Sequence, residues 1–166
     1  MKKQSAPAPI ASRPRMPGYG IVAAAEGQGL LPWSWAVARM RKTRNCWLST
    51  VRPGPRPHAM PIWGVWHEGA FYSSTGRRSV KARNLARNPR CVVCFDDRRQ
   101  QLVLEGAARR VTSRARIRAA GVPYRKKYAL ALDPKLGPVF AVRPRRAFAF
   151  TEDAHFYSTA TRWRFP

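Results

Sequence analysis

The stretch that decides the fold is C-W-L-S-T-V-R-P-G-P-R-P-H-A-M-P-I-W-G-V-W, residues 46–66. It contains two extended apolar runs, 46–51 and 58–66, on either side of R-P-G-P-R-P, whose prolines and glycine exclude regular structure. The pattern predicts two paired antiparallel strands. Because Pro61 cannot donate a hydrogen bond to a neighbouring strand, we expect an edge, a bulge or a local break at that position.

Further strands and helices follow at short intervals along the chain. Helical patterns cover 31–45, 79–88 and 113–132, the last in two pieces that we expect to separate near Gly121-Val122-Pro123. About six or seven strands in consecutive hairpins, with helices at the connections, indicate a mainly β fold, an antiparallel barrel, and argue against a βαβ dinucleotide fold. Beyond the opening pair, the predicted strands are 70–75, 90–95, 100–112, 138–144 and 146–151.

The length of 166 residues suits one domain. Residues 1–30 are rich in Ala, Pro, Gly and Ser and are expected to form a flexible N-terminal arm, which leaves 31–166 as the domain. No apolar run approaches the roughly 20 residues of a membrane span, and the N-terminus lacks the apolar core of a secretory signal. Since Cys46, Cys91 and Cys94 suggest no disulfide framework, we expect a cytoplasmic protein.

Positive charge dominates the composition. The 32 Lys and Arg side chains against 8 Asp and Glu give a formal net charge of +24, spread over the length of the chain. Such a charge indicates an anionic partner, which the composition leaves open as nucleic acid, a phosphorylated cofactor or an acidic metabolite. A merely solvated basic surface is the remaining alternative.

The usual motifs of catalysis and metal binding are missing. The pair C-V-V-C at 91–94 lies in an extended run, where residues three apart point to opposite faces, so we expect structural cysteines. The three histidines are scattered, no G-x-S-x-G elbow is present, and few carboxylates are available as acids or bases. Neither common nucleotide-binding loop occurs. We therefore predict no catalytic side chain and no metal ligand.

The stretch S-S-T-G-R-R-S-V-K, residues 73–81, places hydroxyls and cations where a helix begins, with Ser79 as an acceptable N-cap. Together with the free backbone N–H groups of a helix start, they would form a site for a phosphate monoester. The alternative is a solvated basic helix. The side chains concerned are Ser73, Ser74, Thr75, Arg77, Arg78, Ser79, Lys81 and Arg83.

The C-terminal stretch S-T-A-T-R-W-R-F-P, residues 158–166, combines aromatic and guanidinium groups. Such groups suit packing on a flat ring or in a subunit interface. Packing of Trp163 and Phe165 in the core of their own chain is the alternative.

Four blocks in collinear order resemble the pyridoxamine 5'-phosphate oxidase-related family of flavin-binding split barrels. They are W-S-W-A at 33–36, the stretch 47–66, G-A-F-Y-S-S-T-G-R-R-S-V-K-A-R-N-L-A-R-N-P at 69–89, and A-T-R-W-R-F at 160–165. The resemblance implies a six-stranded antiparallel Greek-key split barrel. It also implies a homodimer with two cofactor sites at its interface, which hold FMN or the deazaflavin coenzyme F420.

The resemblance further implies roles for individual residues. Residues 60–63 match the strand along the cofactor ring, and residues 73–75 match ring and ribityl contacts. Ser79 and Lys81 match the phosphate-binding element, and the C-terminal Trp-Arg pair matches residues that reach the cofactor from the partner subunit. The candidate cofactor-binding residues are therefore Met60, Pro61, Ile62, Trp63, Ser73, Ser74, Thr75, Arg78, Ser79, Lys81, Trp163 and Arg164.

The sequence departs from the family pattern in three respects. The turn at 53–57 reads P-G-P-R-P where relatives usually show an Asp-Gly hairpin, which we expect to change only the turn. Val80 stands where relatives often carry Arg, so Arg77 or Arg78 would supply that charge. The substrate-binding signature of the true vitamin B6 oxidases has no match, so we do not expect oxidation of pyridoxamine phosphate.

The function that these features predict is an oxidoreductase dependent on FMN or F420, which moves a hydride to or from a small organic substrate. The cofactor supplies that chemistry, so no catalytic Asp, Glu or His is needed. One alternative is a flavin or haem carrier without turnover. A nucleic-acid-binding barrel with stacking aromatic side chains is the less favoured alternative.

Overall fold

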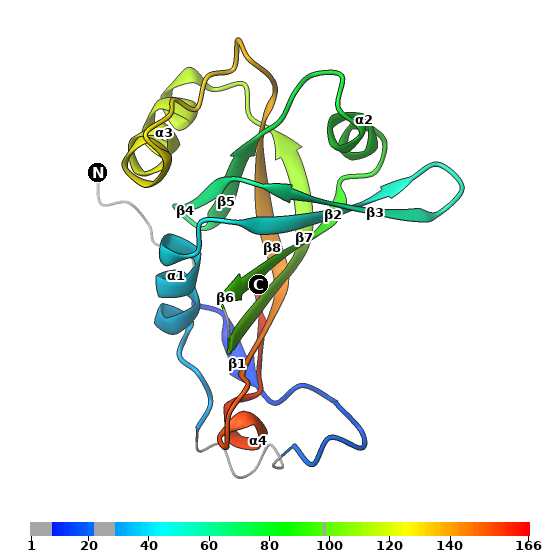
Figure 1. Cartoon of the computed structure of the whole chain (residues 1–166), viewed down its shortest axis with the longest axis vertical. Coiled ribbons are helices and arrows are strands. Elements are labelled where there is room, and N and C mark those ends of the chain that lie inside the picture. The colour runs from blue at the N-terminus through cyan, green and yellow to red at the C-terminus, as the bar shows by residue number, and fades with distance from the viewer. Residues whose placement is uncertain (1–7, 22–28, 98) are drawn as a thin grey trace.

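The computed structural model describes residues 8–21, 29–97 and 99–166, which form one antiparallel sheet with helices at its margins (Figure 1). Helices α2 and α3 cover one end of the sheet, α1 lies along one side, and α4 lies at the opposite end. The strands are β1 (Ile10–Ser12), β2 (Cys46–Arg52), β3 (Arg56–Ile62), β4 (Gly64–His67), β5 (Ala70–Ser74), β6 (Arg90–Asp97), β7 (Gln100–Arg110), β8 (Val139–Thr151) and β9 (Thr161–Arg164). The helices are α1 (Trp33–Lys42), α2 (Val80–Arg87), α3 (Arg114–Tyr128) and α4 (Phe156–Thr159).

The strand pairing describes a six-stranded barrel with an interruption. Antiparallel ladders connect the strands in the order β3-β2-β6-β7-β8-β5-β4. Only Trp63 separates β3 from β4, so the two ends of this order are halves of one broken strand. Counted in this way, six strands form the barrel, and β9 and β1 extend the sheet beyond it along β8. The predicted mainly β class is confirmed.

The last long strand differs from the prediction. The runs 138–144 and 146–151 were expected to be separate, but β8 is continuous and bends at a bulge opposite Glu105 and Gly106. Pro144 pairs with Gly106 at this bulge, which is a position where a strand tolerates proline. A Cβ on Gly106 would lie 2.2 Å from the carbonyl oxygen of Arg143, so only glycine permits this close approach. The bend lets β8 pair first with β5 and then with β9.

Helix α3 is also continuous, which corrects the prediction of a break near Gly121-Val122-Pro123. Proline removes one backbone hydrogen bond from a helix. The buried side chains of Ile117, Ala120, Tyr124 and Tyr128 lie on one face and pack in the smaller of two buried clusters, beside β4 and β5. We attribute the continuity of the helix to this packing.

The N-terminal segment is partly ordered. Residues 1–30 were expected to form a flexible arm, but β1 pairs with β9 within that stretch, and Arg13 Nη1 donates to the carbonyl oxygen of Ala160 at 3.2 Å. The expectation is therefore wrong for residues 10–13. The part of the expectation that concerns residues 1–7 and 22–28 lies outside the described residues. None of the helices in the described part of the chain is long and apolar enough to cross a membrane.

Candidate functional site

Strand β3 forms an edge of the sheet, as the proline at position 61 predicted. In the described chain it pairs with β2 alone. Pro57 and Pro61 both lie on this strand, and each is compatible with pairing only if its nitrogen faces away from β2. Since backbone groups alternate along a strand, Ala59 has the same orientation. The outer edge of β3 therefore offers three carbonyl oxygens and a single N–H group over residues 57–61.

The start of α2 lies at one end of this edge. The Oγ of Ser79 accepts a hydrogen bond from the backbone nitrogen of Ala82 at 3.1 Å, which confirms Ser79 as the N-cap. Thr75 Oγ1 lies 3.1 Å from Ser79 Oγ, and Ser74 Oγ donates to the carbonyl oxygen of Pro138 at 3.4 Å. The structure thus brings two of the predicted hydroxyls, Thr75 and Ser79, together at the helix N-terminus, where anions are favoured.

His58 also lies at this end of the site, although no motif in the sequence singles it out. Its Nδ1 lies 3.3 Å from Thr50 Oγ1, and Asn84 Nδ2 of α2 donates to the same hydroxyl at 2.9 Å. Desolvation, followed by the positive charges of Arg52 and Lys81, lowers the pKa of His58. These three side chains therefore share one electropositive region, which we call the cationic end.

The other end of the β3 edge is aromatic. The Trp63 indole, 47% exposed, stacks on the Tyr128 ring of α3 with centroids 5.4 Å apart and planes 14° apart. The Arg44 guanidinium lies 5.3 Å from the centroid of the Tyr128 ring. We call Trp63 and Tyr128 the aromatic end. Nothing in the sequence pattern connects two residues so far apart along the chain.

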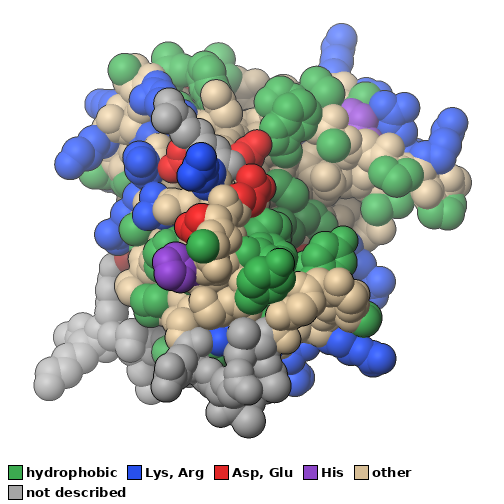
Figure 2. Space-filling model, turned by 60° about the horizontal axis from the view of Figure 1, so that its bottom comes forward, with side chains coloured by type: hydrophobic (Ala, Val, Ile, Leu, Met, Phe, Trp, Pro, Cys, Tyr) green, Lys and Arg blue, Asp and Glu red, His purple; other side chains and the backbone are tan. Residues whose placement is uncertain are grey.

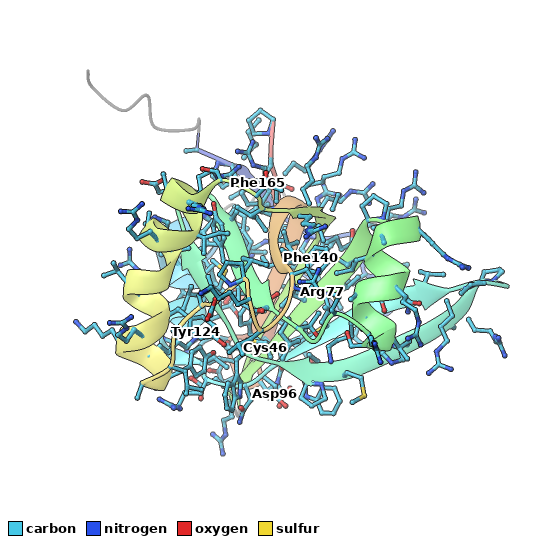
Figure 3. All side chains as sticks on the ribbon, turned by 90° about the horizontal axis from the view of Figure 1, so that it is seen from above. Cys46, Arg77, Asp96, Tyr124, Phe140 and Phe165 are labelled. Atoms are coloured by element: carbon cyan, nitrogen blue, oxygen red, sulfur yellow. The ribbon has the colours of Figure 1, made fainter. Side chains whose placement is uncertain are left out.

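The two ends of the β3 edge differ in chemistry and lie well apart. Five residue steps separate His58 from Trp63, which corresponds to about 17 Å along a strand. Helices α2 and α3 lie on opposite sides of the sheet when the molecule is viewed from above (Figure 3). The arrangement suits a ligand with an anionic group at one end and a planar group at the other.

Several of the few carboxylates lie elsewhere. Gln101 Nε2 donates to Asp96 at 3.2 Å and to Glu152 at 3.0 Å, which brings β6 together with the segment after β8. Figure 2 shows acidic side chains gathered in one small area of a surface that is otherwise rich in Lys and Arg. The charged side chains that shift the pKa of His58 are Arg52 and Lys81, and neither is a carboxylate.

A family profile described as pyridoxamine 5'-phosphate oxidase matches residues 36–151, which is more than half of the chain. The chain belongs to the pyridoxamine 5'-phosphate oxidase family. No curated protein matches it by sequence.

Solved structures show the same fold as this family member. A conserved hypothetical protein from Mycobacterium tuberculosis matches with a TM-score of 0.67 and 20% identity, covering 75% of this chain and 88% of that one. HutZ, the heme storage protein from Vibrio cholerae, matches with a TM-score of 0.60 and 16% identity, covering 71% and 92%. A protein described as an F420 reductase matches with a TM-score of 0.55 and 20% identity, covering 66% of this chain and 93% of that one. At these identities the likeness shows the fold alone, and the predicted split barrel is confirmed.

The predicted site residues of this family member differ in accessibility. Ser73 is only 3% exposed and pairs with Gly64 and Phe140 inside the sheet, so its side chain is not open to a ligand. Ile62 is also buried, whereas Met60 is 43% exposed. Half-buried or exposed side chains at the start of α2 and beside it are Ser74, Thr75, Arg78, Ser79 and Lys81.

The C-terminal pair is divided between the core and the surface. Trp163 is fully buried, and its ring meets Trp33 of α1 edge to face at 5.3 Å. Of the two predicted interpretations, packing in the core of its own chain is the one the structure shows for Trp163, which corrects its assignment as a cofactor contact. Side chains along β9 alternate between buried and more exposed positions, and Arg164 is exposed.

Arg164 lines a groove of about 910 Å³ on the outer face of the sheet. Arg90, Arg145 and Arg146 also line this groove, together with Glu105. Apolar side chains of β2, β3 and β6 lie among them, including Val51, Pro57 and Val92. Thr50, whose hydroxyl lies 3.3 Å from His58 Nδ1, also lines this groove, so the groove adjoins the cationic end.

The cysteines have the properties of core residues. Burial raises the pKa of Cys46 and of Cys91 to about 12, and it also raises that of Cys94. These thiols stay protonated at neutral pH and are poor nucleophiles and metal ligands. Among the residues that the structure describes, no group of three or more His, Cys, Asp or Glu is placed to hold a metal ion.

Proposed function

We propose that this protein is an oxidoreductase that binds FMN or coenzyme F420 along β3 and transfers a hydride to or from a small organic substrate. The observation that carries the proposal is the polarity of the β3 edge, with a cationic end at α2 and an aromatic end at α3. Family membership supports it, and one protein of the same fold is described as an F420 reductase.

The cationic end fits the phosphate group of either cofactor. The charges of Arg52 and Lys81 disfavour the protonated form of His58 there, and a bound anion would offset this effect. Arg78 would add a further guanidinium from the loop before α2. The hydroxyl of Thr75, 3.1 Å from Ser79 Oγ at the same helix start, would donate to a phosphate oxygen, whereas Ser74 would do so only after giving up its hydrogen bond to Pro138.

The outer edge of β3 and the aromatic end fit the planar ring. Carbonyl oxygens of residues 57–61 would accept a hydrogen bond from an imide N–H group of the ring, while Trp63 would cover the ring end and exclude water. When bound, the cofactor supplies the hydride chemistry. The residues of this chain bind, orient and shield, which agrees with the absence of a carboxylate among the groups acting on His58.

We further propose that the working unit is a homodimer in which both subunits contribute to each site. Trp47 is 49% exposed on the outward face of the sheet, and the apolar residues of the groove lie on the same face. A surface of this kind indicates a protein interface. Arg164 on that face would then reach a neighbouring subunit.

The test is a fluorescence titration of the purified protein with FMN and with F420, each at low and at high salt. We expect one of them to bind with little salt dependence and the bound cofactor to be reduced by a suitable donor. Tight binding without any reduction would instead assign a carrier. Binding of single-stranded DNA whose log affinity falls steeply with log salt, with no cofactor binding, would assign a nucleic-acid-binding module.

A further inference from the structure

Polar side chains from α3 hold the chain at the break between β3 and β4, where Trp63 precedes Gly64, the first residue of β4. The hydroxyl of Tyr128 accepts a hydrogen bond from the Gly64 nitrogen at 3.1 Å and lies 2.6 Å from the carbonyl oxygen of Arg44, to which it donates. Lys127 Nζ donates to the carbonyl oxygens of Gly64 at 3.1 Å and Met40 at 2.9 Å. Two consecutive residues of one helix thus satisfy both backbone groups of Gly64.

The backbone at this break has no room to move inward. A Cβ on Gly64 would lie 2.2 Å from the Phe71 ring and 2.7 Å from the carbonyl oxygen of Tyr72. Phe71 is fully buried, so its ring cannot yield easily. The chain therefore passes Gly64 in one narrow position, and Trp63 before it is directed to the surface.

Burial shifts the pKa values of the two α3 side chains in opposite directions. Burial raises the pKa of Tyr128 to about 12, so its hydroxyl remains protonated. Burial lowers the pKa of Lys127. The carbonyl oxygens of Met40 and Gly64 accept hydrogen bonds from its amino group. Among the described residues, no salt bridge includes Lys127, and its amino group donates to backbone carbonyl oxygens instead.

Trp63 is consequently a fixed surface aromatic group. One face of its indole lies against the Tyr128 ring, while 47% of the residue stays exposed. Rigid aromatic side chains offer binding area at a small entropic cost. A flexible Trp at the same place would lose part of its binding free energy in becoming ordered.

We propose that Lys127 and Tyr128 are positioning residues that hold Trp63 as a rigid platform for the planar group of the ligand at the aromatic end. The proposal rests on the proposed function for the identity of that ligand, but the fixed position of Trp63 is a property of the unliganded chain. A positioning role predicts that removing the Tyr128 hydroxyl changes the ring end of the site and leaves the cationic end unchanged.

The experiment uses the full chain labelled with 5-fluorotryptophan and observed by fluorine NMR, with the Trp63 signal assigned from Trp63→Phe. Tyr128→Phe keeps the ring stack but removes the hydroxyl, and Lys127→Met removes the amino group. Tyr124→Phe is the matched control, since it removes a hydroxyl from the same helix and from a ring 4.9 Å from that of Tyr128. The thermal midpoint of each variant shows whether it is folded.

We expect the Trp63 signal to shift and broaden in Tyr128→Phe and in Lys127→Met, and to stay unchanged in Tyr124→Phe. We also expect Tyr128→Phe to bind FMN about tenfold more weakly, as for the loss of one hydrogen-bonded contact, with an unchanged ratio of FMN to riboflavin affinity. An unaltered Trp63 signal in both folded variants would overturn the proposal. A Trp63 signal that responds to the variants but not to FMN or F420 in the wild type would uphold the positioning role and contradict the proposed function.

Discussion

The two helices that flank the β3 edge contribute to it in opposite ways. Helix α2 contributes charge and hydrogen-bond donors at its N-terminus, close to Ser79, and its position is fixed through Asn84 and Thr50. Helix α3 contributes an aromatic surface and a rigid connection at its C-terminus, through Tyr128. The difference supports the proposal that one end of the site recognises charge and the other recognises a flat ring.

The largest effect on this comparison is expected from Lys81→Ala at the cationic end. Loss of a charge-assisted contact should weaken FMN or F420 binding by about 1–3 kcal/mol. Arg87→Ala is the matched control, because it removes one positive charge from the exposed C-terminal end of the same helix. Titration calorimetry measures both. Equal cofactor affinities for Lys81→Ala and the wild type would show that the phosphate is not bound at this end of the site.

A smaller effect is expected from Trp63→Ala at the aromatic end. Loss of one aromatic contact should weaken cofactor binding by about 0.5–1.5 kcal/mol. The loss should be the same for cofactors with and without a phosphate group, because the planar ring is common to both. Tyr157→Ala serves as control, since Tyr157 is a 52% exposed aromatic residue in α4 at the opposite end of the molecule. A Trp63→Ala protein with wild-type affinity would place the ring elsewhere.

The smallest effect concerns pH. The pKa of His58 is lowered in the free protein, and a bound anion should raise it, so binding should take up a proton. Affinity should therefore be higher below the pKa of His58 and fall as the pH rises through the raised pKa of the complex. The phosphate of FMN titrates near pH 6 itself, so the useful quantity is the difference between wild type and His58→Gln. Identical dependence of cofactor affinity on pH in the two proteins would show that His58 does not interact with the bound anion.

Local signals in the sequence predicted the α2 end of the site well. The helix start at Ser79, its cap and the hydroxyls before it are neighbours along the chain, so their spacing alone brings them together. The edge position of β3 was also predictable, because Pro61 excludes a neighbour on one side. The strand pairs joined by short turns follow from the same kind of local information.

Long-range contacts determine what the sequence did not predict. Tyr128 stacks on Trp63, and the packing of α3 on the sheet explains why Pro123 does not break the helix. Trp163 is of a residue type that suits contact with a flat ring, but it lies in the core. The pairing of β9 with β8 turns its indole inward. Such outcomes depend on which elements meet in space, and a pattern within one segment carries no information about that.

The most direct test of the central claim compares FMN with riboflavin, which has the same ring but no phosphate, on wild type and on Lys81→Ala. The same comparison applies to F420 and its dephosphorylated deazaflavin. A polarised site predicts that the wild type prefers the phosphorylated form by at least about tenfold, and that Lys81→Ala loses most of this preference without losing affinity for riboflavin. An equal preference in both proteins would contradict the account, because it would show that the phosphate is not bound at the start of α2.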